Sequence, residues 1–262
     1  MKLSCVLLVY AKPGSRIQKS ALDSVIQTLK GFGISFDAKE RDGVVDPDFR
    51  GRDLIISFGG DGTYLRCSHH ILDRTPVLGI NPDPSTKEGF FTRATAGDFE
   101  GKLGRILNND FKEIALNRLE TKMGKKLPCL ALNDIYIGHK APYCTFRYKL
   151  KVGMDQENQK SSGIIAAAPA GSHAWLNSAG GKKQPLSSEQ FQFIVREVYE
   201  GRLTASSIKK GMLSRDQALE VTSHIDHGIV VIDSIGEEHP LKAAQTVRVG
   251  LSDKPLIMID IG

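Results

Sequence analysis

The chain has 262 residues, 40% of them hydrophobic and 25% charged, which is the composition of a globular protein with one large or two modest domains. No apolar run approaches the ~20 residues that span a bilayer, so we expect no membrane partner. The net charge of +5 is spread along the sequence without a basic stripe or stacking aromatics. This pattern disfavours nucleic acid and favours small anionic molecules as partners.

The four cysteines are scattered and contain no C-x-x-C pair, which indicates reduced thiols rather than a disulfide framework or a metal site. The first residues, MKLSCVLLVYAKPGS, superficially resemble a signal peptide. The turn at Lys12-Pro13-Gly14 instead favours a buried first strand that leads into a helix. We therefore expect a cytoplasmic protein.

The first hundred residues alternate between strand and helix patterns. Apolar runs predict strands at residues 5–11, 53–58 and 76–81, and the segment ISFDAKE (34–40) can form a further strand. Leu22, Val25 and Leu29 recur at helical spacing, a short helix follows the glycine turn at 59–63, and another helix covers 99–107. Strands that alternate with helices predict a parallel sheet with right-handed crossovers.

The second half is rich in strand patterns separated by Gly, Pro and Lys turns. The predicted strands are FKEIALNRLETKM, LPCLALNDIYIG, CTFRYKLKV, GIIAAAP, ALEVTSH, GIVVIDS, TVRVGL and PLIMIDI. One helix is expected at 187–199, where Phe191, Ile194, Val195 and Val198 share a helical face. We therefore predict an α/β domain at 1–105 and a β-rich domain at 106–262.

The stretch SFGGDGTYLR places Gly59-Gly60-Asp61-Gly62-Thr63 between a strand and a helix. Glycines permit positive φ and present no Cβ to a ligand, and a helix start attracts anions. A carboxylate there can take a proton from an attacking hydroxyl or help to hold Mg²⁺. The residues alone leave two interpretations open: a phosphate cradle, or a structural turn with Asp61 as the helix N-cap.

Four stretches in this order resemble the NAD kinase family. SFGGDGTYLR is similar to the GGDGT segment of the family, and VLGINPDPSTKEGFFT (77–92) to its G-I-N…G-F strand and loop. LALNDIYIGHKAP (130–142) resembles the Asn-Glu strand, and SSGIIAAAPAGSHAWLNSAGG (161–181) the P-T-G-S-T-A-Y and S-A-G-G stretch. The S-S-G, A-W and INPDP features look more like the divergent mitochondrial-type branch.

The resemblance implies a two-domain kinase that transfers phosphate from ATP, with Mg²⁺, or from polyphosphate to the adenosine 2′-hydroxyl of NAD. It implies that Asp61 is the general base or the hydroxyl-orienting group, in a site between the domains. By the same resemblance, NAD and ATP are the small-molecule partners and a homo-oligomer is expected. The implied substrate-binding residues are Gly60, Gly62, Thr63, Phe90, Asn133, Asp134, Ser162, His173, Ala174, Trp175 and Ser178.

Several residues depart from the family pattern. Asp134 stands where the family has Glu, Ser162 where many members have Asp, and His173 and Trp175 replace Thr and Tyr, while Asp233-Ser234-Ile235 replaces D-G-Q. Two alternatives therefore stay open: a GGDGT kinase with a lipid or nucleotide acceptor, and an NAD(P)-binding protein without turnover. His69-His70 is expected to have a surface or packing role, because adjacent helical residues chelate metal poorly.

Overall fold

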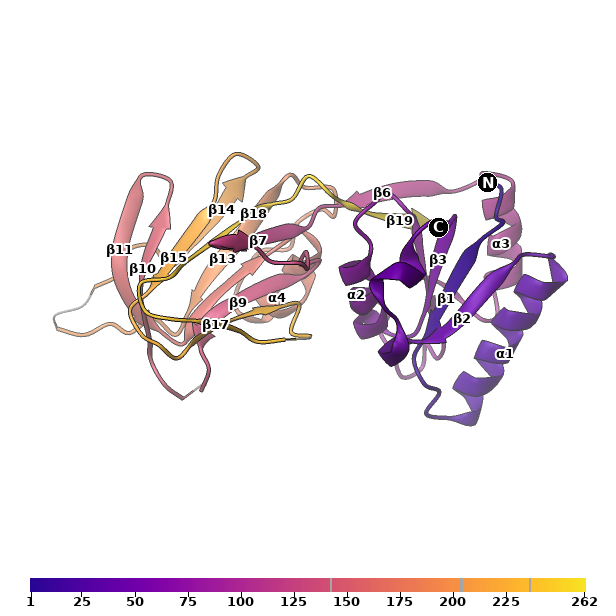
Figure 1. The fold of residues 1–262 in the computed structure, drawn as a ribbon, viewed down its shortest axis with the longest axis horizontal. Coiled ribbons are helices and arrows are strands. Elements are labelled where there is room, and N and C mark those ends of the chain that lie inside the picture. The colour runs from indigo at the N-terminus through magenta and orange to yellow at the C-terminus, as the bar shows by residue number, and fades with distance from the viewer. Residues whose placement is uncertain (142, 203–204, 236) are drawn as a thin grey trace. The chain divides into compact units, whose positions relative to one another are not determined.

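The computed structural model describes residues 1–141, 143–202, 205–235 and 237–262 (Figure 1). The chain divides into two compact units, Met1–Ala115 with Leu256–Gly262, and Leu116–Pro255. Within the described residues, no helix is long and apolar enough to cross a membrane. Each unit is built around its own apolar core.

The first unit is an α/β layer built on one sheet. Its described strands form a seven-stranded sheet in the order β2-β1-β3-β4-β19-β6, with β5 also paired to β4. The strands are β1 (Val6–Tyr10), β2 (Phe36–Glu40), β3 (Leu54–Phe58), β4 (Val77–Asn81), β5 (Thr92–Thr95), β6 (Lys112–Leu116) and β19 (Leu256–Asp260). β2, β1, β3 and β4 pair in parallel, as the sequence predicts, and β5, a strand that was not predicted, pairs in parallel with β4.

The helices of this unit are α1 (Arg16–Gly31), α2 (Asp61–His70) and α3 (Phe99–Leu107), with single 3₁₀ turns at Arg41–Gly43 and Asp46–Phe49. Apolar residues of α1 and α3 pack with alternate residues of β1, β3 and β4 in one core. α2 packs against β3 and β1 without joining that core. The strand order turns between β1 and β3, and α2 starts at the carboxyl end of β3. Open α/β sheets bind their ligands at such a switch point.

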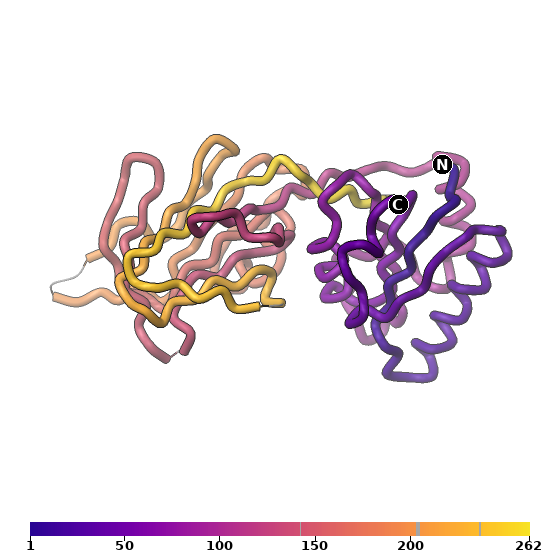
Figure 2. The backbone as a smooth tube through the Cα atoms, in the orientation of Figure 1, coloured from indigo at the N-terminus to yellow at the C-terminus, as the bar shows by residue number. Residues whose placement is uncertain are grey.

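The division into units differs from the predicted one in two ways. The first unit extends to Ala115, ten residues past the predicted boundary, because β6 still belongs to its sheet. The last strand, β19, also returns to this sheet between β4 and β6, instead of closing the β-rich unit. The yellow end of the chain accordingly lies beside the purple strands of the first unit (Figure 2). Leu256 to Ile259 are almost completely buried there, which explains their continuous apolar character.

The second unit is a sandwich of two six-stranded sheets among the described residues. One sheet has the order β11-β10-β15-β18-β7-β8 and the other β14-β13-β12-β9-β16-β17. The first contains β7 (Leu119–Met123), β8 (Lys125–Lys126), β10 (Phe146–Val152), β11 (Asp155–Ser161), β15 (Leu219–Ser223) and β18 (Thr246–Leu251). The second contains β9 (Asp134–His139), β12 (Gly163–Ala167), β13 (Gln190–Arg196), β14 (Lys210–Ser214), β16 (Gly228–Ile232) and β17 (His239–Leu241). Apolar residues from both sheets share one core.

The helix predicted at 187–199 is wrong, because this segment forms β13. Phe191, Phe193 and Val195 point into the core of the sandwich, while Ile194 packs on the other face of the sheet with the short helix α4 (Trp175–Ser178). A strand buried on both faces carries apolar residues on both, so these residues also satisfy a helical spacing. Pairing with β12 and β14 on either side decides the conformation.

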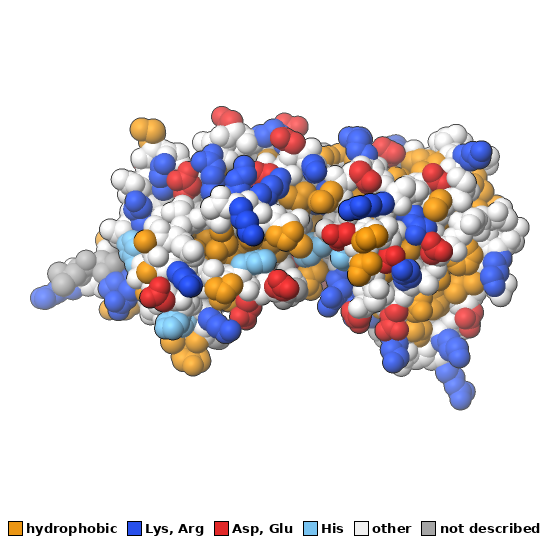
Figure 3. Space-filling model, in the orientation of Figure 1, with side chains coloured by type: hydrophobic (Ala, Val, Ile, Leu, Met, Phe, Trp, Pro, Cys, Tyr) orange, Lys and Arg blue, Asp and Glu red, His pale blue; other side chains and the backbone are white. Residues whose placement is uncertain are grey.

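The fold gathers charges that are dispersed in the sequence. The outer face of the β7-β18-β15-β10-β11 sheet carries two glutamates, Glu120 and Glu220, and seven basic side chains: Lys122, Lys126, Arg147, Lys149, Lys151, Lys160 and Arg248. Lys and Arg side chains outnumber Asp and Glu on the side of this unit seen in Figure 3. The expectation of an evenly spread charge is therefore wrong for this sheet.

Candidate functional site

The glycine turn between β3 and α2 is ordered by packing rather than by unusual backbone angles. None of Gly59, Gly60 and Gly62 has a positive φ, so the expected use of that conformational freedom is wrong. A Cβ on Gly59 would lie 2.3 Å from Oγ1 of Thr63, which is buried and packs over it. A Cβ on Gly62 would meet nothing within 4 Å. Gly59 is therefore needed for packing, and Gly62 leaves the surface beside Asp61 open.

Asp61 is the first residue of α2, and the N-cap is Gly60. The interpretation of Asp61 as the N-cap is thus wrong. Its carboxylate points away from its own helix and accepts the main-chain N–H groups of Phe90, at 3.1 Å, and Phe91, at 2.9 Å. A carboxylate held on two N–H groups has a fixed direction. The structure thereby joins Asp61 to the predicted residue Phe90.

The loop that carries Phe90 is held by its own polar side chains. Asn81 donates from Nδ2 to the Lys87 carbonyl at 2.9 Å and accepts the Asp83 N–H at 3.0 Å. The Asp83 carboxylate accepts the N–H and hydroxyl of Ser85 and the hydroxyl of Thr86, and these bonds lower its pKa. The loop is therefore a folded segment that presents Phe90 and Phe91 to Asp61.

Two aromatic contacts fix the end of this loop. The Phe91 ring stacks on Tyr64 of α2 at 4.9 Å with an interplanar angle of 4°. Phe90 meets Phe91 edge to face at 5.0 Å and is itself half-buried. Phe91 is therefore the anchor, and Phe90 is the ring that remains accessible beside Asp61.

Lys87 is a candidate that the sequence reasoning missed. A Cβ on Gly60 would lie 3.6 Å from Cδ of Lys87, so the aliphatic stem of this lysine passes over the glycine turn. The side chain thus brings a cation to a helix start, which is a pairing that phosphate sites use. The only sequence signal was its place in the loop before Gly89-Phe90.

In the second unit, Asn133 and Asp134 lie at the start of β9, where Asp233 holds the main chain. The Asp233 carboxylate accepts the N–H groups of Leu132 at 2.9 Å, Asn133 at 2.7 Å and Asp134 at 3.0 Å. Asp134 is 3% exposed, and this burial together with the charge of Asp233 raises its pKa to about 7. Asp134 therefore holds its proton more tightly than an exposed aspartate does.

Trp175 and Ser162 are linked through Tyr136 of β9. The rings of Tyr136 and Trp175 lie 5.5 Å apart, and the Arg196 guanidinium lies 5.2 Å over the tryptophan ring. The Tyr136 hydroxyl donates to the Ser162 carbonyl at 2.6 Å. The Ser162 residue lines a cavity of about 370 Å³ with Ser161, Glu197 and Tyr199 among its walls. Tyr136 and Arg196 were not predicted, because nothing in the sequence pairs them with Trp175.

The remaining predicted residues lie around the turn before α4. The imidazole Nε2 of His173 lies 2.8 Å from the Gln184 carbonyl, which ties the short 3₁₀ helix η3 (Ala170–His173) to the following loop. Ala174 connects η3 to α4 and is half-buried, and Ser178 is exposed at the end of α4. His173 thus has a structural partner, and Ser178 is free to meet a ligand only at the surface.

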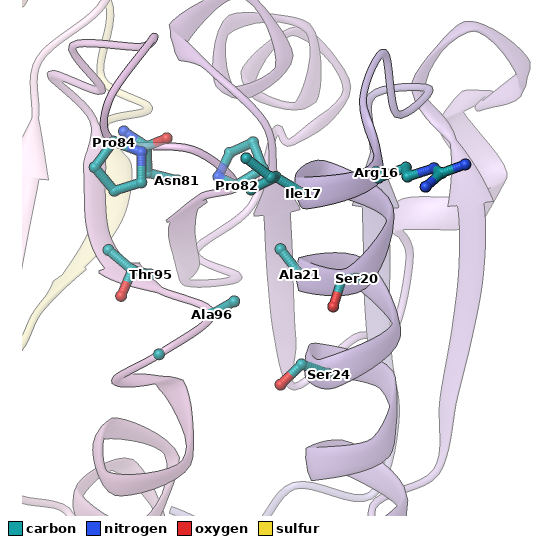
Figure 4. Close-up of a pocket in the computed structure, with 11 residues that line it drawn as sticks. Arg16, Ile17, Ser20, Ala21, Ser24, Asn81, Pro82, Pro84, Thr95 and Ala96 are labelled. Carbon is teal, nitrogen blue, oxygen red and sulfur yellow. The ribbon is translucent and has the colours of Figure 1, made fainter.

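Two other features of the structure do not join these residues. A cavity of about 670 Å³ in the first unit is formed by α1, the 81–84 loop and the 95–97 turn, and its walls contain no predicted site residue. Figure 4 shows that Arg16, its one charged wall residue, points away from the opening. His70 pairs with Asp46 at 2.6 Å and stacks on Phe49 at 4.8 Å. In the described residues, no three His, Cys, Asp or Glu side chains form a metal-binding group.

The predicted residues therefore form two sets, one in each unit: Gly60, Asp61, Gly62, Thr63 and Phe90 in the first, and Asn133, Asp134, Ser162, His173, Ala174, Trp175 and Ser178 in the second. The first set offers a fixed carboxylate beside an open helix start. The second offers a buried carboxyl, an indole ring and hydrogen-bonding groups, which suit a base and a sugar.

Comparison with known proteins defines the class. Residues 11–111 match the family model of the ATP-NAD kinase N-terminal domain. The chain is similar in fold to yeast NADH kinase complexed with NADH (TM-score 0.83, 17% identity, 98% of this chain and 83% of that one). It is also similar to an NAD kinase from Archaeoglobus fulgidus in complex with ATP (TM-score 0.79, 23% identity, 97% of this chain and 92% of that one). The fold is thus that of the two-domain NAD kinases, as predicted.

A curated relative extends this result to the sequence. A probable NADH kinase of Oryza sativa subsp. japonica is 30% identical over 275 residues, which cover 97% of this chain and 84% of the relative. The chain belongs to the NAD kinase family, which confirms the resemblance of its ordered motifs.

Proposed function

We propose that this protein is an NAD kinase, which transfers the γ-phosphoryl group of ATP to the adenosine 2′-hydroxyl of NAD. Family membership supports the reaction class. The observation that carries the proposal in this chain is the placement of Asp61, fixed on the N–H groups of Phe90 and Phe91 at the switch point of the sheet. An oriented carboxylate beside a helix start suits proton removal next to a phosphate.

In this reaction the 2′-oxygen attacks the γ-phosphorus and the bond to the β-phosphate oxygen breaks, leaving ADP. Asp61 orients the hydroxyl and accepts its proton, because its carboxylate direction is set by two main-chain donors. The open surface over Gly62 lets phosphate oxygens approach the N–H groups of the first turn of α2. Lys87 adds a positive charge at the same turn.

The second set of residues binds the dinucleotide. Trp175 supplies an aromatic ring, which is held by a tilted contact with Tyr136 and by the Arg196 guanidinium. Asn133 and Asp134 supply a carbonyl, an amide and a carboxyl that can bond to sugar hydroxyls or to the base. Ser162, Ala174 and Ser178 line this region without adding charge.

Mg²⁺ would enter with ATP. It binds triphosphates through phosphate oxygens and needs only one or two protein carboxylates, with water as the remaining ligands. Asp61 is the carboxylate at the glycine turn, and each of its oxygens keeps a lone pair beyond the bonds to Phe90 and Phe91. When bound, the ion would neutralise charge on the transferred phosphoryl group.

The test is direct. Purified protein is incubated with ATP, Mg²⁺ and NAD, and NADP formation is followed with an NADP-specific dehydrogenase. Calorimetry with NAD runs in parallel. If NADP does not form while NAD binds, the protein is a dinucleotide-binding protein rather than a kinase. Phosphorylation of lipid vesicles instead of NAD would favour the other GGDGT acceptor class.

A second acceptor, NADH, is favoured by the names of the Oryza relative and of the yeast structure. The same assay with NADH, read as NADPH formation, compares kcat/KM for the oxidised and reduced dinucleotides. Polyphosphate in place of ATP tests the donor.

We also propose that the protein works in the cytoplasm as a homo-oligomer. The strand β14 ends its sheet and has the exposed residues Lys210 and Met212, so it offers to a second copy an edge that no other described strand pairs with. Light scattering during gel filtration measures the oligomeric state.

A further inference from the structure

Asp233 makes an unusual set of contacts. It follows β16, and its carboxylate accepts three consecutive main-chain N–H groups, those of Leu132, Asn133 and Asp134, from a segment about 100 positions earlier. Its own N–H donates to the Asp134 carbonyl at 2.8 Å. Asp233 is 4% exposed, so these bonds form away from water. Charge-assisted bonds of this kind are about twice as strong as neutral ones.

The backbone at this point is held in an uncommon conformation. Asp233 and Ser234 have φ values of 52° and 53°, in the left-handed region that Asp and Asn tolerate better than most residues. The turn thereby directs the Asp233 carboxylate back toward the start of β9. A simple end to β16 would need neither the strained turn nor the buried charge.

The segment that Asp233 holds is packed from the other side as well. The Asn133 carbonyl accepts the Ala168 N–H at 2.8 Å, and a Cβ on Gly171 would lie 1.9 Å from the same oxygen. The main chain of Asn133 therefore sits between Gly171 and Asp233 with no room to shift. Its side chain is less restrained, since Asn133 Oδ1 is buried with no hydrogen-bond partner among the described residues. The direction of the Asn133 side chain is therefore set by the contacts that hold its main chain, and not by partners of the side chain itself.

We propose that Asp233 is a positioning residue for dinucleotide binding, which fixes the main chain of Leu132–Asp134 so that the side chains of Asn133 and Asp134 are presented to NAD. The proposal rests on the proposed function, because it concerns the NAD site of that reaction. Asp233 itself need not touch the substrate.

A second effect of Asp233 gives a signature that a purely structural residue would lack. Besides burial, its negative charge is the cause that raises the pKa of Asp134. Neutralising Asp233 should therefore lower the pKa of Asp134. Any change in NAD affinity with pH that arises from Asp134 should then occur at lower pH. Loss of a merely structural bond would lower stability and leave the pH dependence of NAD affinity unchanged.

The test compares Asp233→Asn with Asp53→Asn. Asn keeps the shape of Asp233 and tolerates the left-handed backbone, but removes the charge and one acceptor. Asp53 is a matched control, because its carboxylate accepts the N–H groups of Ser4 at 2.7 Å and Cys5 at 2.8 Å in the first unit, at the amino end of β3. Calorimetry of NAD binding across pH, KM values and thermal unfolding are measured for both. If Asp233→Asn is insoluble, Asp233→Ser takes its place.

For Asp233→Asn we expect NAD affinity to fall about tenfold, as for loss of a hydrogen bond to a charged group. The KM for ATP should change less than about twofold, and the pH at which NAD affinity changes should fall. Asp53→Asn should lower the unfolding temperature and leave both properties unchanged. If the two variants had the same NAD affinity and the same pH dependence of that affinity, the positioning role would be overturned. Wild-type protein that binds no NAD would refute the proposed function, and the positioning role with it.

Discussion

The carboxylate of Asp61 accepts the main-chain N–H of Phe91 at 2.9 Å, although the two residues are 30 positions apart in sequence. This bond connects the start of α2 to the end of the 81–92 loop. It gives Asp61 a fixed direction and makes the loop depend on the same carboxylate that is proposed to act on the substrate. Catalysis and local stability are therefore coupled at this residue.

Asp61→Asn should lower kcat by about 10²-fold or more, as expected for loss of a general base. It should also weaken the loop by about 1–3 kcal/mol, because the amide NH₂ of Asn cannot accept one of the two N–H groups. Steady-state kinetics and thermal unfolding measure the two effects. Wild-type turnover in this variant would exclude a catalytic role for Asp61.

Asp83→Asn is the matched control, since Asp83 holds Ser85 and Thr86 in the same loop without contacting Asp61. It should lower the unfolding temperature with at most a few-fold change in kcat. A loss of kcat as large as that of Asp61→Asn would mean that loop order, rather than the base, limits the reaction.

Lys87→Met should raise the KM for ATP by about tenfold, since it removes a charge from a phosphate site and keeps the stem that lies over Gly60. The KM for NAD should stay the same. Lys19→Met, on the exposed side of α1, is the control and should alter neither constant. Unchanged ATP kinetics in Lys87→Met would show that the lysine is only a surface residue.

Asp134→Asn should make the second unit more stable at neutral pH. The pKa of Asp134 is raised to about 7 in the folded state from 3.8, so between these values the folded protein keeps a proton that the unfolded chain has lost. The stability due to Asp134 therefore falls as pH rises through this window. Denaturation of both proteins at about pH 5 and about pH 8 should show the advantage of the variant growing with pH. Trp175, the single tryptophan, reports this unit. A constant difference would contradict the raised pKa.

Ile259→Ala should destabilise the first unit by about 2–5 kcal/mol, because Ile259 of β19 is completely buried in its core. Calorimetry should show an earlier transition, while Trp175 fluorescence, which reports the second unit, should change little. Ile17→Ala, at a side chain that is 65% exposed, should have almost no effect. Loss of the Trp175 signal at the same lower temperature would show that the units unfold together.

The sequence predicted the elements whose periodicity was unambiguous. Leu22, Val25 and Leu29 fall on one face of α1, and the run at 53–58 became β3 with both faces buried. It failed at Phe191–Val195, because a fully buried strand and a helix segment share their apolar positions there. It also left β19 in the wrong unit, since an apolar run does not say which sheet it joins.

At the site, the family motifs led to Asp61, Asn133 and Asp134, but not to the groups that hold them. Phe91 contacts Asp61 across 30 positions, and Asp233 contacts Asn133 across 100 positions. Lys87 reaches the site because its side chain crosses the glycine turn. Ser234 departs from the D-G-Q pattern, but the hydrogen bonds to residues 132–134 are made by its neighbour Asp233. Such pairings arise only when distant segments meet.

The insertion of β19 between β4 and β6 also has a consequence for biosynthesis. On the ribosome, residues 1–115 emerge early, yet their sheet stays incomplete until all of 116–255 has been translated. The second unit can fold first, because it is an uninterrupted segment. During this time the position of β19 between β4 and β6 is empty. The nascent sheet is therefore exposed to mispairing for the time needed to translate the second unit, and the arrival of β19 completes the sheet that holds Asp61.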